Sequence, residues 1–241
     1  MDTKPLIAIT GASSGIGEAV ARAFSDAGHP LLLMARRLDR LEALALPRAV
    51  LRQVDVRDRA ALASAVSDAE AQHGPVDLMF ANAGIARLGD IASQPPEEWD
   101  EMIDINTKGV MNSVHAVLNG MIGRRQGTLV MMSSIAGRKV YPDHTVYCGT
   151  KFFVHAVSES LRGYLAPHNV RVVVVSPGIV DTEVLDHVND PRTLENYRTN
   201  KAAIGGGISA DIVAGLILDA YALPQRAIVQ EIVVTPTQQT Y

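Results

Sequence analysis

The feature that most constrains the fold of this chain is a repeated alternation of short, unbroken apolar runs with longer segments of helical period. Most of the runs lack a polar residue at every second position. A parallel sheet covered on both faces requires such strands, because both sides of each strand are then buried. The runs occupy residues 6–9, 31–34, 50–54, 76–80, 129–132, 170–175 and 228–234.

Segments of helical period fill the gaps between the apolar runs. Strands that alternate with helices along a whole chain are typical of an α/β fold, in which one doubly wound parallel sheet is covered by helices on both faces. We therefore expect about seven strands and, since no linker or repeat divides the sequence, one domain over residues 1–241. The predicted helices cover residues 15–27, 38–45, 58–73, 97–122, 145–166 and 210–221.

The composition argues against several functional classes. The 241 residues carry a formal net charge of −4, which gives no general reason to expect binding to nucleic acid or to an anionic membrane. No apolar run approaches the ~18 residues of a membrane span. The single cysteine, Cys148, cannot form an intramolecular disulfide, and no secretory signal is visible. We expect a soluble cytoplasmic protein.

One long segment, residues 179–209, has no clear period and follows the apolar run at 170–175. In doubly wound sheets, ligands bind beyond the carboxyl ends of the strands. A long insertion at this point is therefore predicted to be a substrate-binding loop or lid. An ordinary variable loop is the alternative.

The first apolar run ends in a glycine-rich turn, from Thr10 to Gly17, that leads into a predicted helix. Glycines let the backbone approach a pyrophosphate closely, and a helix N-terminus offers unpaired N–H groups with a partial positive charge. The Gly-Lys-Ser/Thr of a triphosphate-binding loop is absent, which favours a dinucleotide over ATP. A turn that only caps the helix is the alternative. The predicted phosphate-binding residues are Gly11, Ser13, Ser14, Gly15, Ile16 and Gly17.

The second apolar run indicates which dinucleotide binds. An NAD enzyme usually places Asp or Glu near the end of this strand to bind the ribose 2′-hydroxyl. The chain has Ala35 there, followed by Arg36 and Arg37. Arginine meets a 2′-phosphate with a forked pair of hydrogen bonds, so we predict NADP(H), with Arg36 as the main contact and Ser13 or Arg37 in support. Two solvated surface charges are the alternative.

A candidate acid/base pair, Tyr147 and Lys151, stands at i and i+4 at the start of a long predicted helix. To exchange protons near neutrality, a tyrosine must lower its pKa from about 10, which is worth roughly 4 kcal/mol. A positive charge about 4 Å away supplies about that much at an effective dielectric of about 20, so Lys151 is predicted to do most of the tuning. Ser134 lies just past the 129–132 run, where its hydroxyl can donate to a substrate oxygen.

Together these motifs make the chain resemble the short-chain dehydrogenase/reductase family over nearly its whole length. The resemblance implies a Rossmann fold, a homo-oligomer (a tetramer, or a dimer) and an enzyme that interconverts an alcohol and a carbonyl by hydride transfer. It rests on the turn from Thr10 to Gly17, Asp55-Val56, Asn82-Ala83-Gly84, Asn106, Ser134, Tyr147 with Lys151, and Pro177-Gly178. The family's Asn-Asn-Ala-Gly begins here with Ala81.

The resemblance also implies a role for each position. Tyr147 would be the general acid/base, Lys151 would lower its pKa and hold the nicotinamide ribose, and Ser134 would polarise the carbonyl. Asn106 would keep a water that relays protons to Lys151. The implied cofactor contacts are Asp55 and Val56 on the adenine, Asn82, Ala83 and Gly84 along the cleft, and Pro177, Gly178, Ile179 and Thr182 near the nicotinamide and pyrophosphate.

The substrate is the least constrained part of the prediction. Several segments are similar to NADP-dependent 3-hydroxy acid (serine-type) dehydrogenases and clavulanic-acid-type aldehyde reductases, which implies small hydroxy acids, aldehydes or secondary alcohols. Arg87 is either a carboxylate-binding residue or a surface charge. Histidines lack metal-ligand spacing, so no metal is expected. A non-catalytic NADP(H)-sensing regulator with the same fold is the rival reading. Expected pocket residues are Ile85, Arg87, Ile135, Tyr141, Pro142, Val184 and Leu185.

Overall fold

The computed structural model describes residues 4–240 and contains one seven-stranded parallel sheet. Its strand order is β3-β2-β1-β4-β5-β6-β7, so the chain winds outward from β1 in one direction and then, from β4, in the other. The predicted doubly wound sheet is confirmed. The strands are β1 (Leu6–Thr10), β2 (Leu31–Ala35), β3 (Ala49–Gln53), β4 (Val76–Ala81), β5 (Gly127–Met132), β6 (Val170–Pro177) and β7 (Glu231–Val234).

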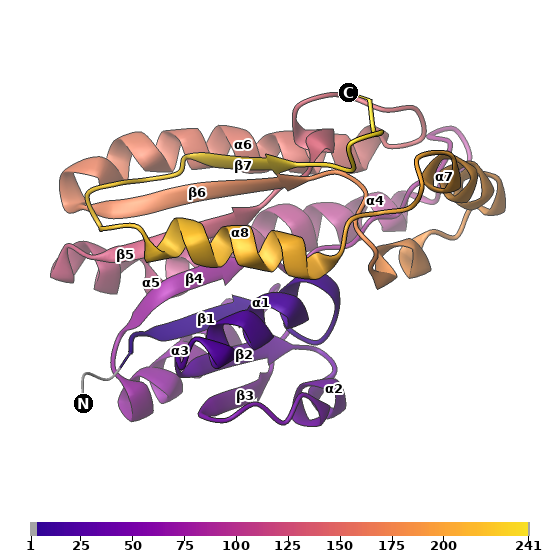
Figure 1. Ribbon diagram of the computed structural model, residues 1–241. Helices are drawn as coiled ribbons and strands as arrows, with labels where there is room; N and C mark the ends of the chain where they lie inside the picture. The colour runs from indigo at the N-terminus through magenta and orange to yellow at the C-terminus, as the bar shows by residue number, and fades with distance from the viewer. Residues whose placement is uncertain (1–3, 241) are drawn as a thin grey trace.

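Helices cover both faces of the sheet (Figure 1). Apolar side chains of α1, α2 and α8 form the core on one face, while those of α3, α4, α5 and α6 form the core on the other. The strands between them are buried on both sides, which explains their unbroken apolar runs. The helices are α1 (Gly15–Asp26), α2 (Leu38–Ala43), α3 (Arg59–His73), α4 (Pro96–Ile103), α5 (Val110–Arg124), α6 (Thr145–Leu165), α7 (Pro191–Ala203) and α8 (Ala210–Ala222).

The predicted helix over residues 97–122 is in fact broken. A π-helical turn, Asp104–Gly109, separates α4 from α5. Asn106 in this turn is fully buried, and its side chain bonds to the backbone of Ile85. Apolar spacing alone does not reveal such an insertion, and π turns of this kind occur often at functional sites.

The segment 179–209 is more ordered than a loop. It contains a 3₁₀ segment, Glu183–His187, and the helix α7. Because Thr193 is the one residue of α7 that is buried, the helix shows no apolar period. Its start was nevertheless visible in the sequence, since Asp190 caps the backbone N–H of Arg192 and Pro191 occupies the first turn.

The strand order indicates at which end of the sheet a ligand would bind. The winding reverses between β1 and β4, and a crevice opens there beyond the carboxyl ends of the strands. Figure 1 shows α7 beyond these ends, at the right of the view. The segment between β6 and α8 therefore lies where it can cover a ligand bound at the crevice.

Candidate active site

A cavity of about 720 Å³ lies at the carboxyl ends of the strands. Residues from distant parts of the chain line it, and they include every predicted catalytic and cofactor-binding residue except Gly17 and Asn106. The predicted lining residues are Gly11, Ser13, Ser14, Gly15, Ile16, Arg36, Arg37, Asp55, Val56, Asn82, Ala83, Gly84, Ser134, Tyr147, Lys151, Pro177, Gly178, Ile179 and Thr182.

The glycine-rich turn after β1 needs its glycines for geometric reasons. Gly11 has a φ of +64°, and a Cβ there would lie 2.9 Å from the Ala83 Cα. A Cβ on Gly17 would lie 2.2 Å from the Gly11 carbonyl oxygen. Gly17 thus lets α1 pack closely against the backbone of the turn, and it does not line the cavity. Helix α1 begins at Gly15, so its free N–H groups face the cleft, as a phosphate site requires.

Asn82, at the end of β4, braces the glycine turn. Its side-chain amide donates to the carbonyls of Thr10 (3.0 Å) and Gly11 (3.2 Å). Its backbone N–H donates to the Thr10 hydroxyl at 3.0 Å. The Asn-Ala-Gly motif after β4 is therefore hydrogen-bonded to the glycine turn after β1, across the crevice where the winding of the sheet reverses.

Asp55, after β3, is held in its ionised form. Its carboxylate accepts from the Arg57 guanidinium at 2.6 Å and from the Arg57 backbone N–H at 2.9 Å. Arg57 lowers the pKa of this carboxyl below its usual range. The neighbouring Val56 packs against Gly109, where a Cβ would lie 2.5 Å from its Cγ2.

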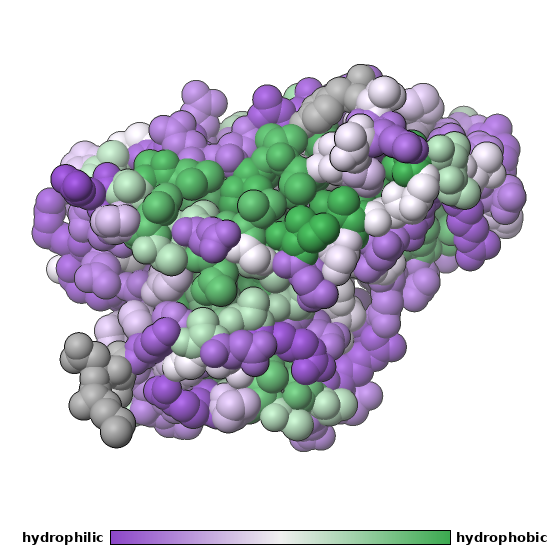
Figure 2. Space-filling model, in the orientation of Figure 1, coloured by the Kyte–Doolittle hydropathy of each residue, from purple (hydrophilic) through white to green (hydrophobic). Residues whose placement is uncertain are grey.

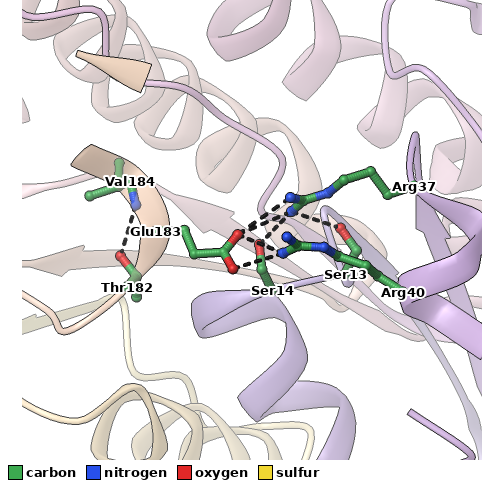
Figure 3. Close-up of polar contacts among 7 residues, drawn as sticks. All are labelled: Ser13, Ser14, Arg37, Arg40, Thr182, Glu183 and Val184. Carbon is green, nitrogen blue, oxygen red and sulfur yellow. Dashed lines mark hydrogen bonds and ion pairs between the residues drawn. The ribbon is translucent and has the colours of Figure 1, made fainter. Parts of the chain in front are cut away.

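Two arginines mark the end of the cleft nearest β2. Arg36 lines the cavity, as does Arg37. The Arg37 guanidinium donates to the hydroxyls of Ser14 (3.0 Å) and Ser13 (3.4 Å), so it ties α2 to the glycine turn (Figure 3). This arrangement places cationic groups beside the turn, as the sequence predicted.

The candidate acid/base residues come together at the other end of the cleft. Tyr147 and Lys151 share one face of α6, with the Lys151 Nζ 5.6 Å from the centre of the tyrosine ring. Lys151 donates to the Met132 carbonyl at 3.1 Å. The Ser134 hydroxyl accepts from the backbone N–H of Ala136 at 3.1 Å. All three line the cavity that holds the glycine turn.

The electrostatics of this pair differ from the expectation that Lys151 does most of the work of lowering the tyrosine pKa. Burial raises the pKa of Tyr147 above its ordinary value, and the interaction with the Ser134 side chain opposes this only partly. Burial also lowers the pKa of Lys151 to about 8. Desolvation is the main cause of both shifts, because each group favours its neutral form in a low-dielectric site.

Asn106 lies behind the cavity wall, next to Lys151. Its amide donates to the Ile85 carbonyl (2.9 Å) and the Thr150 hydroxyl (3.2 Å), and its oxygen accepts from the Ile85 N–H at 2.9 Å. A Cβ on Gly84 would lie 3.2 Å from the Asn106 Oδ1 and 3.7 Å from the Lys151 Nζ. Asn106 thus anchors the segment after β4 against the π turn and α6.

Two of the expected pocket residues lie elsewhere. Arg87 and Pro142 do not line the cavity, although Ile85, Ile135, Tyr141, Val184 and Leu185 do. The Arg87 guanidinium pairs with Glu101 at 3.0 Å and donates to the His187 carbonyl at 2.8 Å. Arg87 therefore ties α4 to the segment after β6, a structural contact that neither reading of this arginine included.

Sequence reasoning missed the C-terminal tail. Gln239 and Thr240 line the cavity, and the Gln239 oxygen accepts from the Ile179 backbone N–H at 2.9 Å. A Cβ on Gly178 would lie 2.2 Å from that oxygen. The signal was the position of the last strand: β7 runs parallel to β6, so the residues after both strands meet at one end.

Two further findings concern metals and membranes. Within residues 4–240 no group of three or more His, Cys, Asp or Glu side chains is placed to hold a metal ion. In the same part of the chain no helix is long and apolar enough to cross a membrane.

The sheet order, the turn after β1 and the cleft at the switch point define a protein of the doubly wound, dinucleotide-binding class. Comparison with known proteins narrows this class. The family model described as short chain dehydrogenase matches residues 5–193. The chain therefore belongs to the short-chain dehydrogenase family, a family of oxidoreductases, as its motifs predicted.

Similar proteins include dehydrogenases and reductases. The NADP-dependent 3-hydroxy acid dehydrogenase YdfG of Salmonella typhi is 39% identical over 73% of this chain and 72% of its own length. Sulfoacetaldehyde reductase 2 of Chromohalobacter salexigens is 35% identical over 98% and 96%. A solved structure, the closed form of serine dehydrogenase complexed with NADP+, is 30% identical and superposes with a TM-score of 0.90, over 98% of this chain and 96% of that one.

Proposed function

We propose that this protein is an NADP(H)-dependent oxidoreductase that interconverts an alcohol and an aldehyde or ketone, with Tyr147 as general acid/base. The observation that carries the proposal is one cleft that joins a phosphate-binding turn at one end to Tyr147, Lys151 and Ser134 at the other. The NADP in the names of a related dehydrogenase and a similar structure agrees with this cofactor.

The residues of the cleft fit NADP(H). The backbone of the glycine turn and the N-terminus of α1 would hold the pyrophosphate, because the close contacts of Gly11 and Gly17 fix the turn against the start of α1, where backbone N–H groups are free. Arg36 and Arg37 would meet the 2′-phosphate, and Asp55 and Val56 the adenine. Asn82, Ala83 and Gly84 would line the middle of the cofactor, with Pro177, Gly178, Ile179 and Thr182 beside the nicotinamide. When bound, NADP(H) supplies or accepts the hydride.

The residues around Tyr147 would move the proton. In reduction the phenol donates to the carbonyl oxygen of the substrate, and in oxidation the phenolate takes the proton back. The Ser134 hydroxyl would orient the substrate oxygen, and Lys151 would hold the ribose and stabilise the phenolate. Asn106 would keep a proton relay to Lys151. Since burial raises the pKa of Tyr147, the free enzyme holds the phenol protonated, which is the form needed to reduce a carbonyl.

The substrate end of the cleft indicates a small carbonyl or alcohol. It is lined by mainly apolar side chains, Ile85, Ile135, Tyr141, Val184 and Leu185. We propose small hydroxy acids, their semialdehydes, and other aldehydes or secondary alcohols as candidates, in line with the names of the relatives. The segment over residues 179–209 would act as the lid on this end.

Replacement of Tyr147 by phenylalanine tests the proposal. With a panel of small aldehydes and NADPH, followed by nicotinamide absorbance, Tyr147→Phe is expected to lower kcat by roughly 10²–10⁴-fold, because the proton donor is gone. The dissociation constant for NADPH is expected to change little. Tyr164→Phe, at an exposed position on the same helix, is the matched control and should keep full activity.

Full turnover by the Tyr147→Phe variant would exclude this mechanism. Tight NADPH binding by the wild-type protein without turnover of any alcohol or carbonyl would instead favour an NADP(H)-sensing regulator. The buried placement of Lys151 and Asn106 beside Tyr147 argues for the enzyme, because a sensor needs no proton relay.

We also propose that the protein is a cytoplasmic homo-oligomer, a tetramer or a dimer. Figure 2 shows apolar side chains gathered over α8 and β7 on the face seen in Figure 1. The exposed members of this apolar patch are Ile212, Leu216 and Leu223 with Val233. Exposed apolar patches of this kind mark surfaces that pair with another protein, here a second copy of this chain.

A further inference from the structure

One carboxylate crosses the cleft to reach the arginines at its far end. Glu183 lies in the 3₁₀ segment that follows β6, and its side chain points at α2 (Figure 3). Both of its oxygens lie 2.7 Å from the Arg40 Nη1, and one lies 3.4 Å from the Arg37 Nη1 and Nη2. A single acidic side chain thus pairs with two arginines more than a hundred residues away in the sequence.

Arg37, one of these two arginines, also contacts the glycine turn after β1. The Arg37 Nη2 that pairs with Glu183 donates to the hydroxyls of Ser13 and Ser14. Ser13, Ser14 and Arg36 line the same end of the cavity. Glu183 therefore sits as an anion among cationic and hydroxyl donors, at the place where the proposed function puts the 2′-phosphate.

A bound 2′-phosphate and the Glu183 carboxylate would compete for the same N–H donors of Arg37. A phosphate monoester recognises arginine through the N–H groups that a carboxylate uses, and both anions take them in pairs. A phosphate bound between Arg37 and the two serines needs the Nη2 that now serves Glu183. Two anions that share these donors also repel each other.

We infer that Glu183 is an internal counter-ion that occupies the 2′-phosphate subsite and is displaced by that phosphate. This makes Glu183 a cofactor-specificity residue whose displacement releases the proposed lid, residues 179–209. The inference rests on the proposed NADP(H) binding. A nucleotide without the 2′-phosphate leaves the ion pairs in place, whereas one that carries it takes Arg37 from Glu183 and weakens the Arg40 pair through repulsion between the two anions. Thr182 and Val184 flank Glu183 and line the cavity, so the release is transmitted to the wall around the substrate.

The ion pair is exposed to solvent and remains ionised at neutral pH. The side chains of Arg37, Arg40 and Glu183 are 44%, 42% and 44% exposed. Arg40 holds the pKa of the Glu183 carboxyl below its usual range, so protonation does not release it near neutrality. Exposed pairs are weak, so a bound phosphate can replace the carboxylate at small cost.

Adenosine monophosphates test the inference without turnover. We would titrate the full-length protein with 2′-AMP and with 5′-AMP by calorimetry. Glu183→Gln removes the competing charge and keeps the shape, so it is expected to tighten 2′-AMP binding by about two- to fivefold, the range of an exposed ion pair. Binding of 5′-AMP should not change.

The matched control is Asp39→Asn. Asp39 precedes Arg40 in α2 and acts on it through its field, without the hydrogen bond that Glu183 makes. If occupancy of the subsite matters and not net charge, this variant should leave the ratio of 2′-AMP to 5′-AMP affinity at the wild-type value. An equal gain in Asp39→Asn and Glu183→Gln would overturn the inference.

A second measurement uses the wild-type protein alone. Saturating 2′-AMP is expected to speed amide hydrogen exchange over residues 183–188, whereas 5′-AMP is not. Unchanged or weaker 2′-AMP binding in Glu183→Gln, or unchanged exchange, overturns the inference while the proposed enzyme stands. Equal affinity of the wild-type protein for the two nucleotides removes the phosphate subsite itself, and with it the proposed preference for NADP(H).

Discussion

Lys151 is a buried ammonium group whose Nζ donates to the carbonyl of Met132. Burial lowers its pKa to about 8, well below the value of about 10.5 that it has in the unfolded chain. Below pH 8 the folded state must keep this charge out of water. Between about pH 8 and 10.5 the unfolded state binds more protons, so this group makes stability rise with pH.

Replacing Lys151 with methionine, which has a similar volume and no charge, should reveal the free-energy cost of burying the ammonium group. Relative to the wild type, Lys151→Met is expected to gain roughly 3 kcal/mol in free energy of unfolding at pH 7, less about 1 kcal/mol for the unpaired Met132 carbonyl. The gain should vanish by about pH 10.5. Urea unfolding of both proteins across this range measures the difference, and a difference that stays constant with pH would contradict the buried charge.

At the residue scale, the sequence predicted which residues meet but not how they pair. Motif residues such as Ser134, Tyr147 and Lys151 could be placed, because each follows a strand or starts a helix at the same edge of the sheet. The Arg37–Glu183 pair joins positions 146 residues apart, and no local pattern specifies such a contact. The direction of the Tyr147 pKa was also beyond reach, since it depends on burial by residues from several elements.

Among the elements, the short 3₁₀ segment Ile135–Gly137 sets the distance between Ser134 and α6. Gly137 lies so close to α6 that a Cβ would be 2.6 Å from the His155 Cδ2 and 2.7 Å from the Lys151 carbonyl. The segment after β5 can therefore approach α6 only with glycine at this position. This contact fixes the position of Ser134 relative to Lys151 on α6.

A methyl group at Gly137 should separate the two elements. Gly137→Ala is expected to cost about 1–3 kcal/mol of stability, as overpacking does, and to lower kcat because Ser134 moves away from Tyr147. Gly215→Ala in α8 is the control: its Cβ meets nothing within 4 Å, so helix propensity should leave stability equal or up to about 1 kcal/mol higher. Thermal unfolding and steady-state kinetics measure both variants. Wild-type kcat in Gly137→Ala would contradict this role.

Elements with a strong apolar pattern were the predictable ones. All seven strands were predicted near their observed positions, because burial on both faces imposes an unbroken apolar run. Helix α7 was missed because few of its side chains meet the core, and the π turn at Asp104–Gly109 was missed because it depends on the contacts of Asn106. The last strand is shorter than expected, since Ile228 and Val229 pack against the core before β7 begins at Glu231.

At the scale of the whole molecule, the apolar patch over α8 and β7 is the surface through which we propose that subunits associate. If this patch lies between subunits, a charge placed in it should be costly, because it would be desolvated on association. Leu216→Glu is expected to lower the mass measured by light scattering toward 25.8 kDa, whereas the wild type should give a multiple of that value. Thr199→Glu, at an exposed position on α7, is the control and should keep the wild-type mass. A monomeric wild type would contradict the proposed assembly.

The packing of residues 179–209, the segment that we propose as the lid, has an evolutionary consequence. Between residues 184 and 197 its apolar side chains rest mainly on a small cluster formed by Ala86, Leu88 and Val188, which meets one of the two large cores at Tyr147. Mutations that reshape this cluster leave the packing of the sheet undisturbed. If this segment does contact the substrate, a lineage can keep the dinucleotide-binding fold while the segment diverges, so that new substrate preferences arise without loss of the fold.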